Sequence, residues 1–128
     1  MARARELARI LHGNYGCAVL VKGGHGNGSS AVDVLFDGAE YAEFPLPWIE
    51  HPVSTHGTGC SLAAALAAEL ALGRTLRDAV AGAKRYVHSA IENSHFVGAD
   101  CGVLGQVRGA DGFRARPVPE DFAGSAYR

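Results

Sequence analysis

The segment STHGTGCSLAAALAAELAL, residues 54–72, decides the fold. In this segment a glycine-rich loop runs directly into a stretch of alanine and leucine. We predict a helix there, with Thr58 or Gly59 as its first residue and about Leu72 as its last, because a glycine follows as a C-terminal stop. Since the stretch carries almost no charge, we expect the helix to be buried on most sides.

The junction between this loop and the helix has the chemistry of an anion site. Free amide groups and the helix dipole concentrate positive potential at a helix N-terminus, where a phosphate can bind. Gly57 and Gly59 have no side chains that would keep the backbone away from such an anion. Cys60 lies in the first turn, within the same field. A tight turn into a helix that buries a small cysteine would have the same sequence, so these residues alone leave both interpretations open.

An apolar run upstream of the loop ends in a lysine. Cys17–Val21 is continuously apolar, which is typical of a strand covered on both faces inside a parallel sheet. Lys22 follows at the end where open α/β sheets bind ligands, and a lysine there can act as a point charge on a phosphate. A lysine that only extends into solvent is the alternative. The glycine-rich residues 23–28 match neither a P-loop nor a dinucleotide-binding motif and predict a flexible turn.

The N-terminal segment predicts a helix. Ala4, Leu7, Ala8 and Leu11 recur at helical spacing, and Gly13 follows as a stop. The arginines at positions 3, 5 and 9 lie mostly off this stripe, so we expect them on a solvated face.

A β-hairpin is predicted between the two glycine-rich loops. The runs Val32–Phe36 and Glu40–Phe44 flank the turn dipeptide Asp37-Gly38. The prolines at positions 45, 47 and 52 then predict a loop rather than regular structure.

A further helix and a polar tail follow residue 73. Thr75 and Asp78 form a capping-box-like start, and the helix runs to about Asn93. Its apolar stripe comprises Leu76, Ala79, Val80, Ala83, Val87, Ala90 and Ile91. Residues 106–128 are polar and aperiodic and predict a flexible tail. The order helix, strand, hairpin, helix, helix indicates an α/β fold with few strands for a complete sheet.

The composition indicates one soluble domain. The chain has 128 residues, 48% apolar and 20% charged, and its formal net charge of -1 gives no general attraction to nucleic acid or to an anionic membrane. No apolar stretch is long enough to span a bilayer, and no signal-peptide core follows the N-terminus. The three cysteines are widely spaced and form no disulfide framework, which indicates a reducing, cytoplasmic location.

Two alternative chemistries involve the histidines and cysteines. Two candidate metal triads are His51, His56 and Cys60, and His88, His95 and Cys101. Neither triad has the spacing of a recognised zinc site, so we predict no metal site. His56 and Cys60 could instead form a nucleophilic pair as in thiol hydrolases, although no third residue that would orient the histidine is evident.

The motifs closely resemble those of one family, the hydroxymethylpyrimidine/phosphomethylpyrimidine kinases of thiamine biosynthesis, which are ribokinase-like. The resemblance covers residues 1 to about 105. It includes Val21-Lys22-Gly23-Gly24-His25, the strand Val32–Phe36 with Asp37-Gly38, and Thr55-His56-Gly57-Thr58-Gly59-Cys60. The last stretch is the most specific, because most ribokinase-like enzymes have aspartate where Cys60 stands. Cysteine there is typical of the pyrimidine kinases, some of which also act on pyridoxal. The resemblance implies the C-terminal portion of a ribokinase-like three-layer α/β sandwich.

The resemblance also implies a role for each candidate residue. Gly57, Thr58 and Gly59 would form the anion hole for the transferring phosphoryl group, and Lys22 would neutralise phosphate oxygens of ATP. Cys60 would lie beside the substrate hydroxymethyl group as a base or positioning group. Phosphoryl transfer requires charge stabilisation and alignment more than covalent catalysis, so these roles are chemically coherent. ATP and Mg²⁺ would be the cofactors and a small pyrimidine the acceptor.

The family pattern begins upstream of this sequence. Met1 aligns with the middle of the family, whose first half would supply most of the pyrimidine pocket, the acidic residues associated with Mg²⁺ and the central strands. We therefore expect residues 1–105 to be the C-terminal half of an ATP-dependent kinase of hydroxymethylpyrimidine or its phosphate, incomplete alone. We expect it to form a homo-oligomer or to assemble with a complementary N-terminal half. The alternative is a non-catalytic nucleotide- or phosphate-binding remnant, or a subunit of a split kinase.

Overall fold

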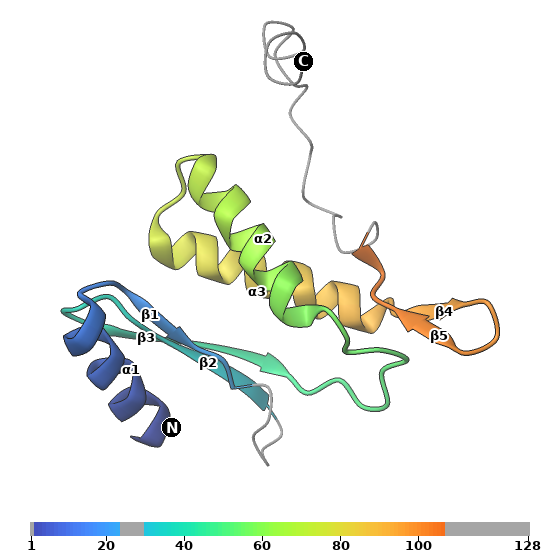
Figure 1. Ribbon diagram of the computed structural model, residues 1–128, viewed down its shortest axis with the longest axis horizontal. Coiled ribbons are helices and arrows are strands. Elements are labelled where there is room, and N and C mark those ends of the chain that lie inside the picture. The colour runs from blue at the N-terminus through green and yellow to red at the C-terminus, as the bar shows by residue number, and fades with distance from the viewer. Residues whose placement is uncertain (1, 24–29, 107–128) are drawn as a thin grey trace, which may run out of the picture.

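The structure, a computed structural model, describes residues 2–23 and 30–106 (Figure 1). The elements are α1 (Ala2–Tyr15), β1 (Val19–Val21), β2 (Ser30–Phe36), β3 (Tyr41–Pro47), α2 (Thr58–Ala71), α3 (Leu76–Glu92), β4 (His95–Val97) and β5 (Cys101–Val103). The α/β class is therefore confirmed. Apart from Gly23, the predicted flexible turn lies outside the described residues, as does the predicted tail apart from Gln106.

The main body has three layers. Strands β1, β2 and β3 form an antiparallel sheet in that order, and β4 and β5 form a separate hairpin. Helix α1 packs against β1 and β2 on one face of the sheet, and α2 and α3 lie on the other side (Figure 1). In the core, Leu20 of β1 packs against a buried cluster from α2 and α3, which consists of Leu62, Ala65, Ala83 and Val87. This helix–sheet–helix order is the sandwich that the resemblance implies.

The apolar run predicts a strand inside a parallel sheet, whereas β1 lies at an edge of the described sheet. Among the described strands it pairs only with β2, antiparallel, with Val19 opposite Phe36 and Val21 opposite Val34. Its residues are half-buried, because α1 lies on one face and the α2–α3 cluster on the other. A continuous apolar run indicates that both faces are covered, and it carries no information about the direction of the neighbouring strand.

The predicted hairpin is confirmed. Strands β2 and β3 pair antiparallel with Phe36 opposite Tyr41. The predicted proline-rich loop was wrong at its start, because β3 continues through Pro45 to Pro47. Within the described sheet β3 is the second edge strand. Prolines two residues apart on an edge strand can both take positions whose missing N–H would point away from the neighbouring strand.

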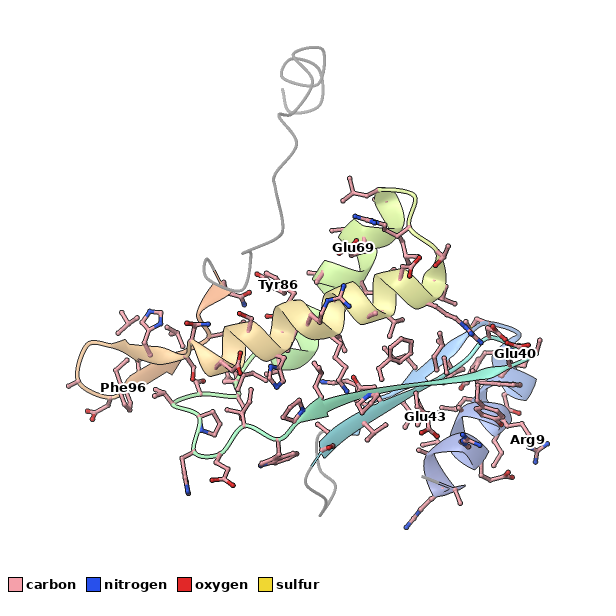
Figure 2. All side chains as sticks on the ribbon, turned by 180° about the vertical axis from the view of Figure 1, so that it is seen from behind. Arg9, Glu40, Glu43, Glu69, Tyr86 and Phe96 are labelled. Atoms are coloured by element: carbon pink, nitrogen blue, oxygen red, sulfur yellow. The ribbon has the colours of Figure 1, made fainter. Side chains whose placement is uncertain are left out.

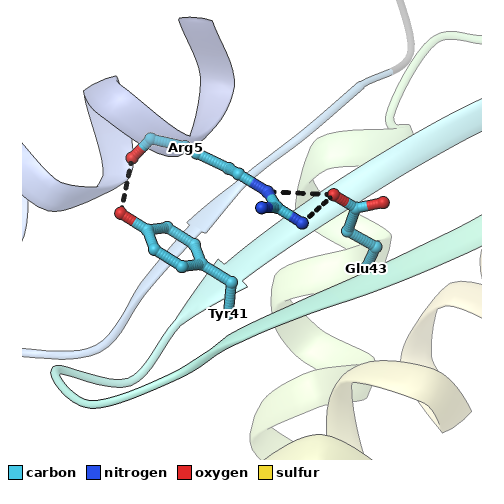
Figure 3. A network of polar contacts seen from close by, with 3 residues as sticks. All are labelled: Arg5, Tyr41 and Glu43. Carbon is cyan, nitrogen blue, oxygen red and sulfur yellow. Dashed lines mark hydrogen bonds and ion pairs between the residues drawn. The ribbon is translucent and has the colours of Figure 1, made fainter. Parts of the chain in front are cut away.

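The helix boundaries agree with the sequence except at the end of α1, which continues past Gly13 to Tyr15. Arg5 of this helix is exposed, as predicted, and it also contacts β3. It donates to Glu43 Oε1 from Nε at 3.1 Å and from Nη2 at 2.7 Å, and its carbonyl oxygen accepts the Tyr41 hydroxyl at 3.2 Å (Figure 3). These contacts attach α1 to β3.

Helix α2 is far less buried than predicted. Only Ser61, Leu62 and Ala65 are buried. The opposite side, which we call the exposed α2 face, consists of Cys60, Ala63, Ala64, Ala67, Leu70 and Ala71. The near absence of charge on this helix predicts burial on most sides, whereas the residues that the structure describes cover one side alone. This apolar face is a property of the chain that the sequence does not reveal by itself.

Helix α3 has the predicted apolar stripe, with one unexpected member. The buried residues are Ala79, Val80, Ala83, Lys84, Val87 and Ala90, so a lysine lies among them. The β4–β5 hairpin that follows α3 is not predicted from the sequence. It projects from the body with Phe96 61% exposed (Figure 2). No helix in the described ranges is long and apolar enough to cross a membrane.

Thr75→Ala is expected to lower the free energy of unfolding by about 1 kcal/mol. The Thr75 hydroxyl accepts the N–H of Asp78 at 3.2 Å and donates to its carboxylate at 2.7 Å, which confirms the predicted cap of α3. Urea unfolding followed by circular dichroism measures the loss, and Thr75→Ser, which keeps the hydroxyl, is the control. Equal stability of the alanine and serine variants would show that the cap contributes nothing.

Candidate functional site

The fold brings Lys22 to the start of α2. Lys22 is the first residue after β1, and its side chain is exposed. Its Nζ lies 3.8 Å from the position that a Cβ on Gly59 would occupy. The two predicted parts of the phosphate site, far apart in the sequence, are therefore neighbours in space.

The first turn of α2 presents free hydrogen-bond donors. Gly57 is the N-cap with φ 86°, a left-handed conformation that glycine adopts without strain, and no side chain caps the helix. The N–H of Thr58 donates to the carbonyl of Thr55 at 3.4 Å, and that of Ser61 to the carbonyl of Gly57 at 2.9 Å.

The N–H groups of Gly59 and Cys60 have no acceptor among the residues that the structure describes. Two adjacent amides without an acceptor and one ammonium group therefore lie near one another at the start of α2, and groups of this kind can together bind an anion.

Cys60 is exposed at this point. The part of the alternative interpretation that buries Cys60 is therefore wrong for the described residues. Its thiol is placed where a group bound at the helix N-terminus could contact it.

A shallow cavity of about 430 Å³ extends from Cys60 along α2. Its lining includes Ser61, Tyr86 and Gln106, none of which a sequence pattern identifies as a site residue. Tyr86 lies on α3 (Figure 2). Gln106 donates from Nε2 to Ser61 Oγ at 2.7 Å, and the Tyr86 hydroxyl donates to Gln106 Oε1 at 2.6 Å. Gln106 is therefore part of the site region rather than of a tail. No local pattern identifies it, since its partners lie on α2 and α3.

A buried ion pair lies behind the Lys22 segment. The carboxylate of Asp33 on β2 is 3.2 Å from Nζ of Lys84 on α3. Burial lowers the pKa of Lys84, and the charge and hydrogen bond of Asp33 oppose this effect. In the sequence, Asp33 is only the polar residue of an alternating strand. Lys84, between Ala83 and Val87 of the apolar stripe, is the one signal of a buried charge.

The structure offers no support for the metal triads. The described residues contain no group of three or more His, Cys, Asp or Glu side chains that could hold a metal ion. Within the same ranges, His56 and Cys60 form no hydrogen bond with each other. The thiol-hydrolase pair is therefore not assembled here.

Comparison with known proteins gives one consistent family. The phosphomethylpyrimidine kinase family matches residues 1–105. The hydroxymethylpyrimidine/phosphomethylpyrimidine kinase of Rhizobium meliloti is 49% identical over 92 residues, which are 72% of this chain and 32% of that protein. The thiamine biosynthesis bifunctional protein ThiED of Geobacter sulfurreducens is 44% identical over 112 residues, 88% of this chain and 23% of that protein. This chain thus spans a third or less of these relatives.

Solved structures of pyridoxal kinases share the fold. A pyridoxal kinase from Bacillus subtilis in an ADP complex has a TM-score of 0.74 and 32% identity, over 82% of this chain and 39% of that one. A pyridoxal kinase from Staphylococcus aureus in complex with AMP-PCP and pyridoxal has a TM-score of 0.77 and 28% identity, over 84% of this chain and 40% of that one. The fold is therefore ribokinase-like.

Proposed function

The chain belongs to the phosphomethylpyrimidine kinase family, and we propose that its site serves the ATP-dependent phosphorylation of hydroxymethylpyrimidine or hydroxymethylpyrimidine phosphate in thiamine biosynthesis. The observation that carries this proposal is the closeness of the Lys22 ammonium to Gly59, where the N–H groups of Gly59 and Cys60 have no acceptor among the described residues. Relatives bound to ADP and AMP-PCP support a nucleotide as the phosphate source. Since the solved relatives are named pyridoxal kinases, pyridoxal is the alternative acceptor.

The phosphate-binding residues have complementary tasks in this proposal. Lys22 neutralises phosphate oxygens of ATP, and the backbone of Gly57, Thr58 and Gly59 receives the charge that develops on the transferring phosphoryl group. Fixed donors of this kind stabilise a transition state without having to reorganise during the reaction. The N–H of Thr58 donates to the carbonyl of Thr55 in this structure. Among the described residues of this turn, the amides available to the phosphoryl group are therefore those of Gly57, Gly59 and Cys60.

In this proposal Cys60 acts on the acceptor hydroxyl rather than on ATP. Its exposed thiol lies in the first turn of α2, where it can face the acceptor hydroxyl across the phosphoryl group. There it accepts the hydroxyl proton or positions the hydroxyl for attack.

Mg²⁺ accompanies ATP in this proposal, but the described residues provide no cluster that would hold it. The three cysteines are free thiols, which agrees with a reducing cytoplasm as the place of the reaction.

A second candidate is the phosphate-binding subunit of a split kinase, or a non-catalytic remnant. Two observations favour it: the exposed α2 face and the absence of a described partner at the outer edge of β1. A complementary N-terminal half or a second copy of the chain would cover such surfaces. Both candidates require the same phosphate site.

Lys22→Met is expected to weaken binding of ATP and of inorganic pyrophosphate about tenfold or more, because it removes a charge-assisted interaction with phosphate. Isothermal titration calorimetry on the 128-residue chain measures the change. Arg74→Met is the matched control: it removes one positive charge from a side chain 64% exposed. Similar affinities of the two variants would refute the phosphate site.

A further inference from the structure

The Asp33–Lys84 pair is connected to the phosphate site through Gly23. The side chains of Lys84 and Asp33 are 9% and 8% exposed, and Nζ of Lys84 also donates to the carbonyl oxygen of Ala31 at 2.8 Å. Oδ1 of Asp33 accepts the N–H of Gly23 at 2.8 Å, and Oδ2 faces Lys84. One carboxylate thus joins α3 to the residue that directly follows Lys22.

Packing holds Gly23 at the same place. A Cβ on Gly23 would overlap the carbonyl oxygen of Val32, so only glycine fits this close to β2. This close approach and the hydrogen bond to Asp33 together determine where the backbone leaves β1. The side chain of Lys22 begins at that point and ends at the first turn of α2.

We propose that Asp33 and Lys84 are positioning residues for Lys22. This inference rests on the proposed phosphate-binding function. Asp33 anchors the backbone of Gly23, and Lys84 neutralises Asp33. Without Lys84, the buried carboxylate of Asp33 would lack a counter-ion. The nearest candidate in the chain is the ammonium of Lys22, because Lys22 directly precedes Gly23, which donates its N–H to Asp33. The ion pair therefore leaves the charge of Lys22 available to phosphate.

Three variants distinguish the hydrogen bond between Asp33 and Gly23 from the charge of the Asp33–Lys84 pair. Lys84→Met alone leaves Asp33 buried and unpaired. Asp33→Asn with Lys84→Met removes both charges but keeps an oxygen that can accept the N–H of Gly23. Asp33→Leu with Lys84→Met removes the charges and the acceptor. Replacing a buried ion pair by neutral side chains is often neutral for stability, so the two double variants are matched.

The measured quantity is the dissociation constant of inorganic pyrophosphate on the 128-residue chain, with the free energy of unfolding as a check on folding. We expect Lys84→Met and the leucine double variant each to bind about tenfold more weakly than the wild type, the effect of one lost charge-assisted hydrogen bond. We expect the asparagine double variant to restore affinity to within about threefold. If Lys84 served stability alone, both double variants would recover equally, because both remove the unpaired buried charge.

Adding Lys22→Met to the leucine double variant tests whether the effects share one cause. We expect little further loss, because Lys22 is already misplaced in that background. If Lys22 acted independently of the Asp33–Lys84 pair, the fold losses in pyrophosphate affinity would multiply. Multiplying losses, wild-type affinity of the leucine double variant, or equal losses in the two double variants would each overturn the positioning role.

Asp33→Glu decides the question if the leucine variant does not fold. It keeps the charge but moves the carboxylate relative to the N–H of Gly23, so wild-type affinity would overturn the inference. Failure of the wild type to bind pyrophosphate, or unchanged binding by Lys22→Met, refutes the proposed function itself. Binding that depends on Lys22 but not on Asp33 or Lys84 refutes only the positioning role.

Discussion

The 128-residue chain by itself is expected to show no kinase turnover and to be oligomeric or poorly soluble, and addition of a complementary N-terminal half is expected to improve its solubility and give turnover. The exposed α2 face is apolar along its length, and Leu70 and Leu72 are 42% and 56% exposed. The outer edge of β1 has no partner among the described strands. Large apolar patches and open strand edges drive association unless another chain covers them.

Sedimentation and an ATP-consumption assay with hydroxymethylpyrimidine test this expectation. The complementing chain is the part of the Rhizobium meliloti relative that this chain does not match, since the matched part is 32% of that protein. The Lys22→Met chain is the control, because it should assemble equally well and turn over much more slowly. A stable monomer that phosphorylates the pyrimidine unaided would contradict the prediction.

Cys60→Ala, introduced into the assembled form that turns over, is expected to lower turnover by about 10²–10⁴-fold, the usual contribution of a general base. ATP affinity should change little, because the amides of Gly59 and residue 60 remain. The reason is geometric: the thiol is exposed in the first turn of α2, beside the proposed phosphate position.

Steady-state kinetics, with separate kcat values and KM values for ATP, measure the effect of Cys60→Ala. Cys101→Ala is the matched control, since Cys101 is also an exposed free thiol but lies on the β4–β5 hairpin. A loss of turnover below about tenfold would reduce Cys60 to a packing or positioning residue. A similar loss in the Cys101 variant would mean that the assay reports thiol chemistry unrelated to the site.

The sequence by itself determines the elements whose signals are local. Thr75 and Asp78 are three residues apart and cap α3 as predicted, and Asp37-Gly38 turns β2 into β3. The glycines before Cys60 place the start of α2. Capping, turn chemistry and helical periodicity act between near neighbours in the chain, so they can be inferred before the fold is known.

Only the tertiary structure decides what each element meets. The apolar residues of β1 specify covered faces but not an antiparallel neighbour. The sequence of α2, with Glu69 as its one charged residue, specifies an apolar helix but not which side remains open. Asp33 on β2 and Lys84 on α3 are separated by fifty residues of sequence, yet they form one buried pair. Burial and pairing depend on surfaces brought together from distant segments, and no local pattern in either segment encodes its partner.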